Sequence, residues 1–224
     1  MRATDPPTGL VFGTLLLGLL AALFWPVTRY LITIAHEGSH ALFGSVTGGT
    51  VDSVTVNADS TGLTGIFTSR PFIPALAGYV GPSLFGIVGA MMLAAGARPD
   101  AVLWVAVVLL AVILLQMRNA FGVLAVVVAG FFLVMLVHNA SPDLRAVCAY
   151  TLVWFLLLGG FFSALQWNRR SVGWSSDAGI LRELTRLPMG FWGILWWLLT
   201  LAALIYGGGI LFGAIGAPGS AGGA

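Results

Sequence analysis

Charged residues are scarce in this chain, and lysine is absent altogether. Only 8% of the 224 residues are charged, and ten arginines against eight acidic residues give a formal charge of +2. Soluble domains average about 25% charged residues. The composition therefore excludes an ordinary soluble domain. The few arginines form no basic patch, so we expect no nucleic-acid partner.

Cysteine is almost absent as well. The single cysteine, Cys148, cannot form an internal disulfide, so the sequence gives no sign of an oxidising or a reducing compartment. Because Cys148 lies in an apolar run, we expect it to be a small packing residue.

Long apolar runs take the place of the missing charges. The chain is 58% hydrophobic, and a run of about 20 apolar residues can cross a bilayer as a helix. Such runs cover residues 8–25, 28–47, 72–96, 101–117, 120–138, 146–166 and 190–213. We therefore predict an all-α polytopic membrane protein with about six to seven transmembrane helices. It would form a single domain over residues 1–224 in contact with the lipid bilayer, with a disordered tail over 214–224.

The arginines also suggest an orientation. With seven spans and a cytoplasmic N-terminus, seven of the ten arginines fall on the cytoplasmic side. Short cytoplasmic loops are enriched in arginine. We therefore expect an integral membrane protein, in the plasma membrane, with its N-terminus in the cytoplasm and its C-terminus outside.

Two segments do not have the pattern of simple spans. Residues 51–68 alternate apolar and polar side chains around a polar turn, which predicts a short membrane-associated β-hairpin. Residues 175–188 place leucines at helical spacing opposite arginine and glutamate, as in an amphipathic helix at the cytoplasmic interface. The hairpin at residues 51–68 would present an edge strand for pairing with an extended peptide.

One short motif is the main indication of function. His36, Glu37 and His40 form the pattern HExxH within an apolar run. On a helix both imidazoles lie on one face, so they can bind one zinc ion while Glu37 acts as general base. The alternatives are a polar network that joins helices, or an ion or proton relay in a transporter.

The chain resembles the M50B-like branch of the site-2 protease family, which consists of zinc intramembrane metallopeptidases. The resemblance rests on the HExxH motif, the hairpin after it, and the stretches 78–86, 118–122 and 176–178. It implies cleavage of a transmembrane protein or peptide substrate, with His36 and His40 as zinc ligands and Glu37 as the catalytic base. A catalytically inactive homologue that acts as a membrane binding or scaffold protein is the alternative.

The third metal ligand would have to come from outside the motif usual in this family. Members of this family usually take it from an Asp-Gly motif on a later helix, and residues 101–117 contain no such match. Asp177 is the best substitute, because it falls at the same depth as the motif; alternatively it or Ser176 only caps a helix. Asn119 is a weaker candidate. The neighbouring Arg118 would either stabilise an oxyanion or serve as an interfacial anchor.

Overall fold

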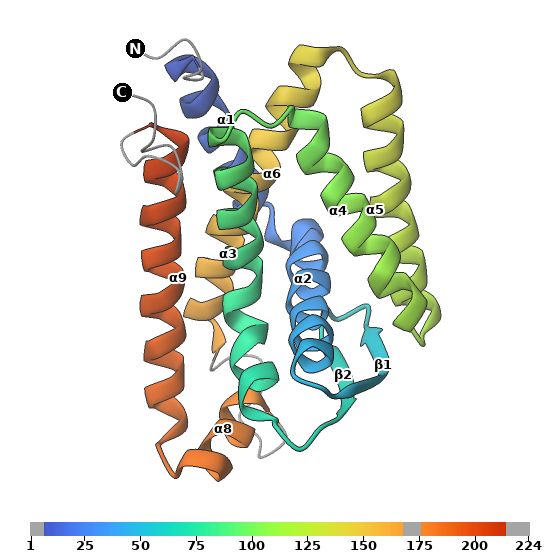
Figure 1. The fold of residues 1–224 in the computed structure, drawn as a ribbon, viewed down its shortest axis with the longest axis vertical. Helices are drawn as coiled ribbons and strands as arrows, with labels where there is room; N and C mark the ends of the chain where they lie inside the picture. Colours follow the sequence, from blue (N-terminus) through green and yellow to red (C-terminus); the bar gives the residue numbers. More distant parts are fainter. Residues whose placement is uncertain (1–6, 168–175, 214–224) are drawn as a thin grey trace.

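The chain folds as a bundle of long helices with a two-stranded hairpin at one end (Figure 1). The structure is a computed structural model that describes residues 7–167 and 176–213. Its elements are α1 (Thr8–Leu23), α2 (Trp25–Val46), β1 (Thr50–Val56), β2 (Gly62–Phe67), α3 (Phe72–Ala94), α4 (Pro99–Gln116), α5 (Ala120–Asn139), α6 (Pro142–Leu165), α8 (Asp177–Thr185) and α9 (Met189–Leu211).

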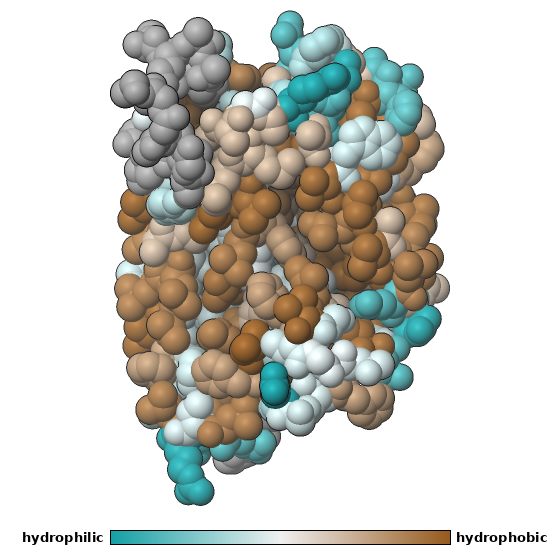
Figure 2. All heavy atoms as spheres, viewed as in Figure 1, coloured by the Kyte–Doolittle hydropathy of each residue, from teal (hydrophilic) through white to brown (hydrophobic). Residues whose placement is uncertain are grey.

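The apolar surface of the molecule forms a belt between two more polar ends (Figure 2). Within the described residues, five helices are long and apolar enough to span a membrane: α3, α4, α5, α6 and α9. The first two helices pass the same test only together, as a pair bent by 97° that forms either one broken span or a re-entrant loop. The fold is thus the expected polytopic helical protein with a β-hairpin. The α1–α2 pair, however, does not supply two separate spans.

Proline explains the break between α1 and α2. Phe24 has non-helical dihedral angles, and Pro26 lies in the first turn of α2. Proline has no backbone N–H to continue the hydrogen-bond ladder of α1, and its ring clashes with the preceding turn. It is well suited to the first turn of a new helix, so a new helix begins here in another direction.

The broken span changes the expected topology. The start of α1 and the end of α9 lie at the same end of the bundle (Figure 1), where the rings of Phe12 and Phe212 are 4.9 Å apart. The expectation of a cytoplasmic N-terminus and an external C-terminus counted α1 and α2 as two crossings. Counted as one broken span, the pair would place both ends of the described chain on the same side.

Helices α3 and α6 form the centre of the bundle. In each of them 56% of the most apolar stretch is buried, against 17% in α4 and α5. Small residues permit this close packing: a Cβ at Gly160 would meet the side chain of Ser83, and one at Gly86 would meet Leu157. The α4–α5 pair stands at the side of the bundle, and most of its surface faces outward (Figure 1).

The hairpin packs along α2. Its strands are antiparallel, with Val54 opposite Thr64 and Val56 opposite Gly62. Its tip is fixed to α2 by two hydrogen bonds. The Tyr30 hydroxyl donates to the carbonyl of Ala58 (2.6 Å), and Thr33 Oγ1 donates to the carbonyl of Ser60 (3.1 Å).

The second edge of β1 is also paired. Val54 forms a parallel bridge with Met117, and the Arg118 N–H donates to the carbonyl of Val54 (2.9 Å). Val54 and Val56 are fully buried. The connection from α4 to α5 thus covers β1, and the edge that stays available in the hairpin is that of β2.

Helix α8 is short and lies at the end of the bundle that carries the hairpin (Figure 1). Ala178 and Leu181 are buried, whereas Leu184 is half exposed. The helix ends at Arg186, which has left-handed dihedral angles. Residue 175 of the predicted amphipathic segment and the predicted tail 214–224 lie outside the described residues.

Candidate metal centre

The two motif histidines lie one turn apart on the same face of α2. Their Nε2 atoms are 3.1 Å apart. The Nδ1 atom of His40 lies 2.8 Å from the carbonyl oxygen of Pro74, in the first turn of α3. Because a carbonyl only accepts a hydrogen bond, Nδ1 carries the proton in the neutral ring. Its Nε2 lone pair is then directed at the cluster, as a metal ligand requires.

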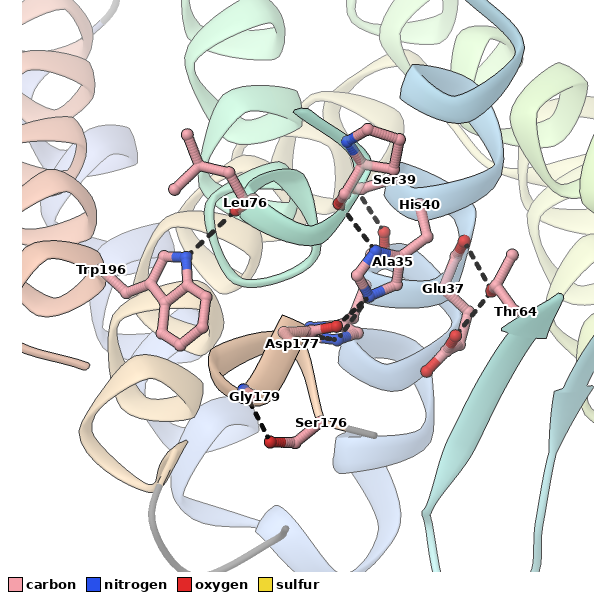
Figure 3. Close-up of polar contacts among 12 residues, drawn as sticks. Ala35, Glu37, Ser39, His40, Thr64, Leu76, Ser176, Asp177, Gly179 and Trp196 are labelled. Carbon is pink, nitrogen blue, oxygen red and sulfur yellow. Dashed lines mark hydrogen bonds and ion pairs between the residues drawn. The ribbon is translucent and has the colours of Figure 1, made fainter. Parts of the chain in front are cut away.

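Asp177 reaches both imidazoles from the first turn of α8 (Figure 3). Its Oδ2 atom is 3.2 Å from His36 Nε2, and its Oδ1 atom is 3.3 Å from His40 Nε2. Burial raises the pKa of the Asp177 carboxyl, but the positive charge of a protonated His40, together with hydrogen bonds from both imidazoles, outweighs burial and holds that pKa below its usual value. The carboxylate is therefore ionised when it faces the two rings.

The helix cap comes from another residue. Ser176 Oγ accepts a hydrogen bond from the Gly179 N–H (3.2 Å), so Ser176 is the N-cap of α8 (Figure 3). Of the two alternatives that the sequence left open, capping thus belongs to Ser176. The Asp177 side chain is directed at the histidines instead.

The three groups fit a zinc ion. Zinc bonds of about 2.0–2.1 Å in a tetrahedral arrangement place neighbouring ligand atoms about 3.3–3.4 Å apart. His36 Nε2 and His40 Nε2 are 3.1 Å apart, and each lies 3.2–3.3 Å from a different oxygen of the Asp177 carboxylate, so that one ligand atom from each residue lies within 4.8 Å of the others. Two imidazoles and one carboxylate are also the donor set of a catalytic site that keeps one position open.

A glycine on α3 makes room for this cluster. A Cβ at Gly78 would lie 2.7 Å from His36 Nε2 and closer still to His40 Nε2. Any side chain at this position would therefore compete for the space between the two imidazoles. At Gly78 the backbone of α3 therefore lies close to the Nε2 atoms of both His36 and His40.

Glu37 lies beside the cluster but faces the hairpin. Only 4% of the residue is exposed. Its Oε2 atom accepts a hydrogen bond of 2.6 Å from Thr64 Oγ1 on β2 (Figure 3). The two imidazoles of the motif thus face α3 and α8, whereas its carboxylate faces β2.

A cavity of about 390 Å³ connects these groups. Its walls come from α2, β2, the start of α3 and α8, and both His36 and Glu37 line it. Hydroxyl groups are frequent on its surface, among them those of Thr33, Thr61 and Thr64. The cavity thus brings several polar groups together at one end of a largely apolar molecule.

Asn119 and Arg118 lie elsewhere. The Asn119 amide donates to the carbonyl of Val56 (2.7 Å), and its Oδ1 atom accepts from the Val56 N–H (3.2 Å). Neither Asn119 nor Arg118 lines the cavity. Asn119 is therefore a hairpin anchor and not a metal ligand, and Arg118 is wrongly placed for oxyanion stabilisation.

Sequence reasoning missed three residues of the site. Pro74 orients His40, Gly78 makes room for the imidazoles, and Thr64 contacts the base. The glycines of the stretch 78–86 favour close helix packing, so a close approach of α3 could be expected there. A threonine in a polar hairpin gives no comparable signal.

Fold and site together define a polytopic membrane protein with a His-His-Asp cluster and an adjacent glutamate. The chain belongs to the Peptidase M50B-like family, whose model matches residues 10–207. No curated protein matches the chain. No solved structure matches it either.

Proposed function

We propose that this protein is a zinc-dependent intramembrane endopeptidase. The observation that carries the proposal is the meeting of three ligand atoms, from His36, His40 and Asp177, at one cavity with the motif glutamate. The family match supports a peptidase, and the apolar belt supports a substrate in the membrane.

The chain's own residues have separate roles in this proposal. His36, His40 and Asp177 would hold the zinc ion. A bound zinc supplies a Lewis acid that lowers the pKa of water and polarises a carbonyl. Glu37 would accept the proton from the attacking water and deliver it to the leaving amine.

The substrate would be a transmembrane segment that has opened locally. A helical peptide bond is shielded, so the substrate must leave its helical conformation, and its freed backbone groups need partners in the membrane. Val54 and Val56 turn their backbone groups toward the α4–α5 connection. In an antiparallel pair, residues opposite each other direct their backbone N–H and C=O groups either both toward or both away from the partner strand. Thr64 and Gly62, which lie opposite Val54 and Val56, therefore direct their backbone groups to the outer edge of β2, where an extended peptide could pair.

The charge distribution supports an orientation in which the α8 end faces the cytoplasm. Within the described chain, Arg70, Arg118, Arg182 and Arg186 lie in or beside elements at this end, Arg98 and Arg145 lie at the other end, and Arg29 lies within α2 (Figure 1). Arginine in short loops favours the cytoplasmic side. The site would then lie near the cytoplasmic surface, and both ends of the described chain would lie on the opposite side.

Metal content and cleavage, measured on the same preparations, test the proposal. We expect about one zinc per chain in the wild-type protein, and loss of both zinc and cleavage in His36→Ala and in His40→Ala. Glu37→Gln should keep the zinc and lower the turnover of a transmembrane model peptide by about 100-fold or more, because general acid–base catalysis contributes about 10²–10⁴-fold.

The outcomes also separate the alternatives. Stoichiometric zinc in the double histidine variant would contradict the metal site. Zinc in the wild-type protein without turnover of any transmembrane peptide would favour the inactive membrane-binding homologue. The inactive homologue is favoured by the missing Asp-Gly motif, but in the proposed site Asp177 would supply the carboxylate of that motif.

A further inference from the structure

The contact between Thr64 and Glu37 joins the hairpin to the reacting end of the motif. Thr64 Oγ1 donates to Glu37 Oε2 at 2.6 Å and lies 3.2 Å from the backbone carbonyl of Glu37. A hydrogen bond from a hydroxyl to an ionised carboxylate is short and about twice as strong as a neutral one. The bond of 2.6 Å lies at the short end of the range for a hydroxyl donor and an oxygen acceptor.

Gly62 adds a steric boundary on the same strand. A Cβ at this position would lie 2.6 Å from Glu37 Cγ and 2.7 Å from Glu37 Cδ. The carboxylate thus lies directly against the backbone of β2 and is held there by the hydroxyl two residues further on. Glutamate has several rotatable bonds, so such a contact selects one of many conformers.

We infer that Thr64 is a positioning residue for the Glu37 carboxylate, and that β2 sets the base and the substrate in register. This inference rests on the proposed role of Glu37 as general base. Thr64 does not touch the substrate's reacting atoms in this account. It acts by holding the carboxylate that takes the proton in one orientation.

The support behind Thr64 is rigid. Threonine is branched at Cβ and therefore has few side-chain conformers. Its partner across the hairpin is Val54, which is fully buried and is fixed in turn by the Arg118 N–H. The tip of the hairpin is fixed to α2 at Ser60. The Glu37 carboxylate is thereby oriented by a hairpin that is itself fixed at its tip and along β1.

The same strand offers its outer edge to a peptide. Among the described residues, no backbone group outside the hairpin bonds to the N–H or carbonyl of Gly62 or Thr64. A peptide paired to these groups would be placed relative to the Thr64 side chain, and hence relative to Glu37. Displacements of about 1 Å at a catalytic group can cost about 100-fold in rate. The register of the peptide is therefore expected to decide which bond is cleaved.

Three variants at position 64 test the inference. Thr64→Val keeps the shape and removes the donor, Thr64→Ala removes both, and Thr64→Ser keeps the donor. We expect Val and Ala to lower kcat by about 10- to 100-fold, with KM changed less than about 2-fold and zinc retained. Serine should restore most of the turnover. If Thr64 had only a structural role, the kcat of Thr64→Ser would be as low as that of Thr64→Ala.

Thr55→Val is the matched control. Thr55 lies on β1, and its hydroxyl donates to the carbonyl of Leu63 (3.3 Å), away from Glu37. Its kcat should stay near that of the wild-type protein. In the Glu37→Gln background, Thr64→Val should cause no further loss, because the group that it positions is gone.

The results distinguish this inference from the proposed function. Wild-type kcat in zinc-loaded Thr64→Val and Thr64→Ala, with Glu37→Gln inactive, would overturn the positioning role alone. Equal losses in Ser, Val and Ala would overturn it too. Full turnover in Glu37→Gln would instead refute the general base and the proposed mechanism with it.

Discussion

The two sides of the cavity are built in different ways. On the ligand side, α2, α3 and α8 bring together His36, His40, Gly78 and Asp177, from segments far apart in the sequence. On the base side, a hairpin that follows α2 directly in the chain folds back on it and holds Glu37 through Thr64. A single turn of α2 supplies residues to both sides.

This difference indicates a division of labour. The ligand side has to converge on one point within a few tenths of an ångström, and this depends on the packing of the whole bundle. The base side has to orient one carboxylate and leave a strand edge available. Changes on the first side should therefore act on metal content, and changes on the second on turnover or on the stability of the hairpin.

The largest effect is expected at Gly78. Gly78→Ala should remove zinc and cleavage together, because the added Cβ would lie 2.7 Å from His36 Nε2 and closer to His40 Nε2. Alanine is otherwise the better helix former by about 0.5–1 kcal/mol, so helix propensity alone predicts no loss. Zinc content and peptide turnover are the measurements.

Gly130→Ala is the matched control for this substitution. Gly130 lies within α5, and a Cβ there meets nothing within 4 Å. This variant should resemble the wild-type protein in zinc content. Normal zinc content in Gly78→Ala would break the comparison, because the ligand side would then not depend on the close approach of α3.

A smaller loss is expected at Asp177. Asp177→Asn keeps a polar side chain of the same shape but loses the charge that faces both imidazoles, and we expect zinc affinity to fall by about 10-fold or more. Affinity can be measured by competition with a zinc chelator in detergent. Turnover at saturating zinc should recover in part.

Asp143→Asn provides the control here. Asp143 also lies in the first turn of a helix that a serine caps, because Ser141 Oγ accepts from the Leu144 N–H. It is exposed at the other end of the molecule, so its zinc affinity should be that of the wild-type protein. If Asp177→Asn also binds zinc as tightly as the wild-type protein, the carboxylate is not a ligand.

The smallest effect is expected at Asn119, on the outer support of the hairpin. Asn119→Ala removes two hydrogen bonds to the backbone of Val56, which is buried. Unsatisfied buried polar groups cost about 1–3 kcal/mol each in stability. We expect a lower unfolding temperature with zinc content unchanged.

For comparison, Asn139→Ala removes an exposed bond to the carbonyl of Met135 and should change stability much less. Loss of zinc in Asn119→Ala, with its fold intact, would mean that the two sides of the cavity are not independent. It would also return attention to Asn119 as a ligand.

The predictable parts of this structure are those whose signal is local. Apolar runs of about 20 residues predicted the spans α3 to α6 and α9, and alternation predicted the hairpin at 51–68. The spacing of His36 and His40 placed both rings on one helical face. Asp177 followed from its depth, and its carboxylate does lie against both rings.

The parts that the sequence did not predict depend on packing between distant segments. The sequence did not reveal that α1 and α2 pass as a span only as one bent pair, because each apolar run alone is about as long as a span. The pairing of β1 with Met117 and Arg118 joins segments with no shared pattern. The Thr64 hydroxyl is one of many in the hairpin, and only the fold selects it.

X-ray absorption at the zinc edge, on the purified protein in detergent, tests the central claim most directly. The account predicts about one zinc per chain, with two imidazole nitrogens and one carboxylate oxygen at about 2.0–2.2 Å and the remaining position filled by a light atom. In Asp177→Asn the same spectrum should keep both imidazoles and lose the carboxylate. A protein that binds no stoichiometric zinc, or a spectrum with fewer than two imidazoles, would contradict the account.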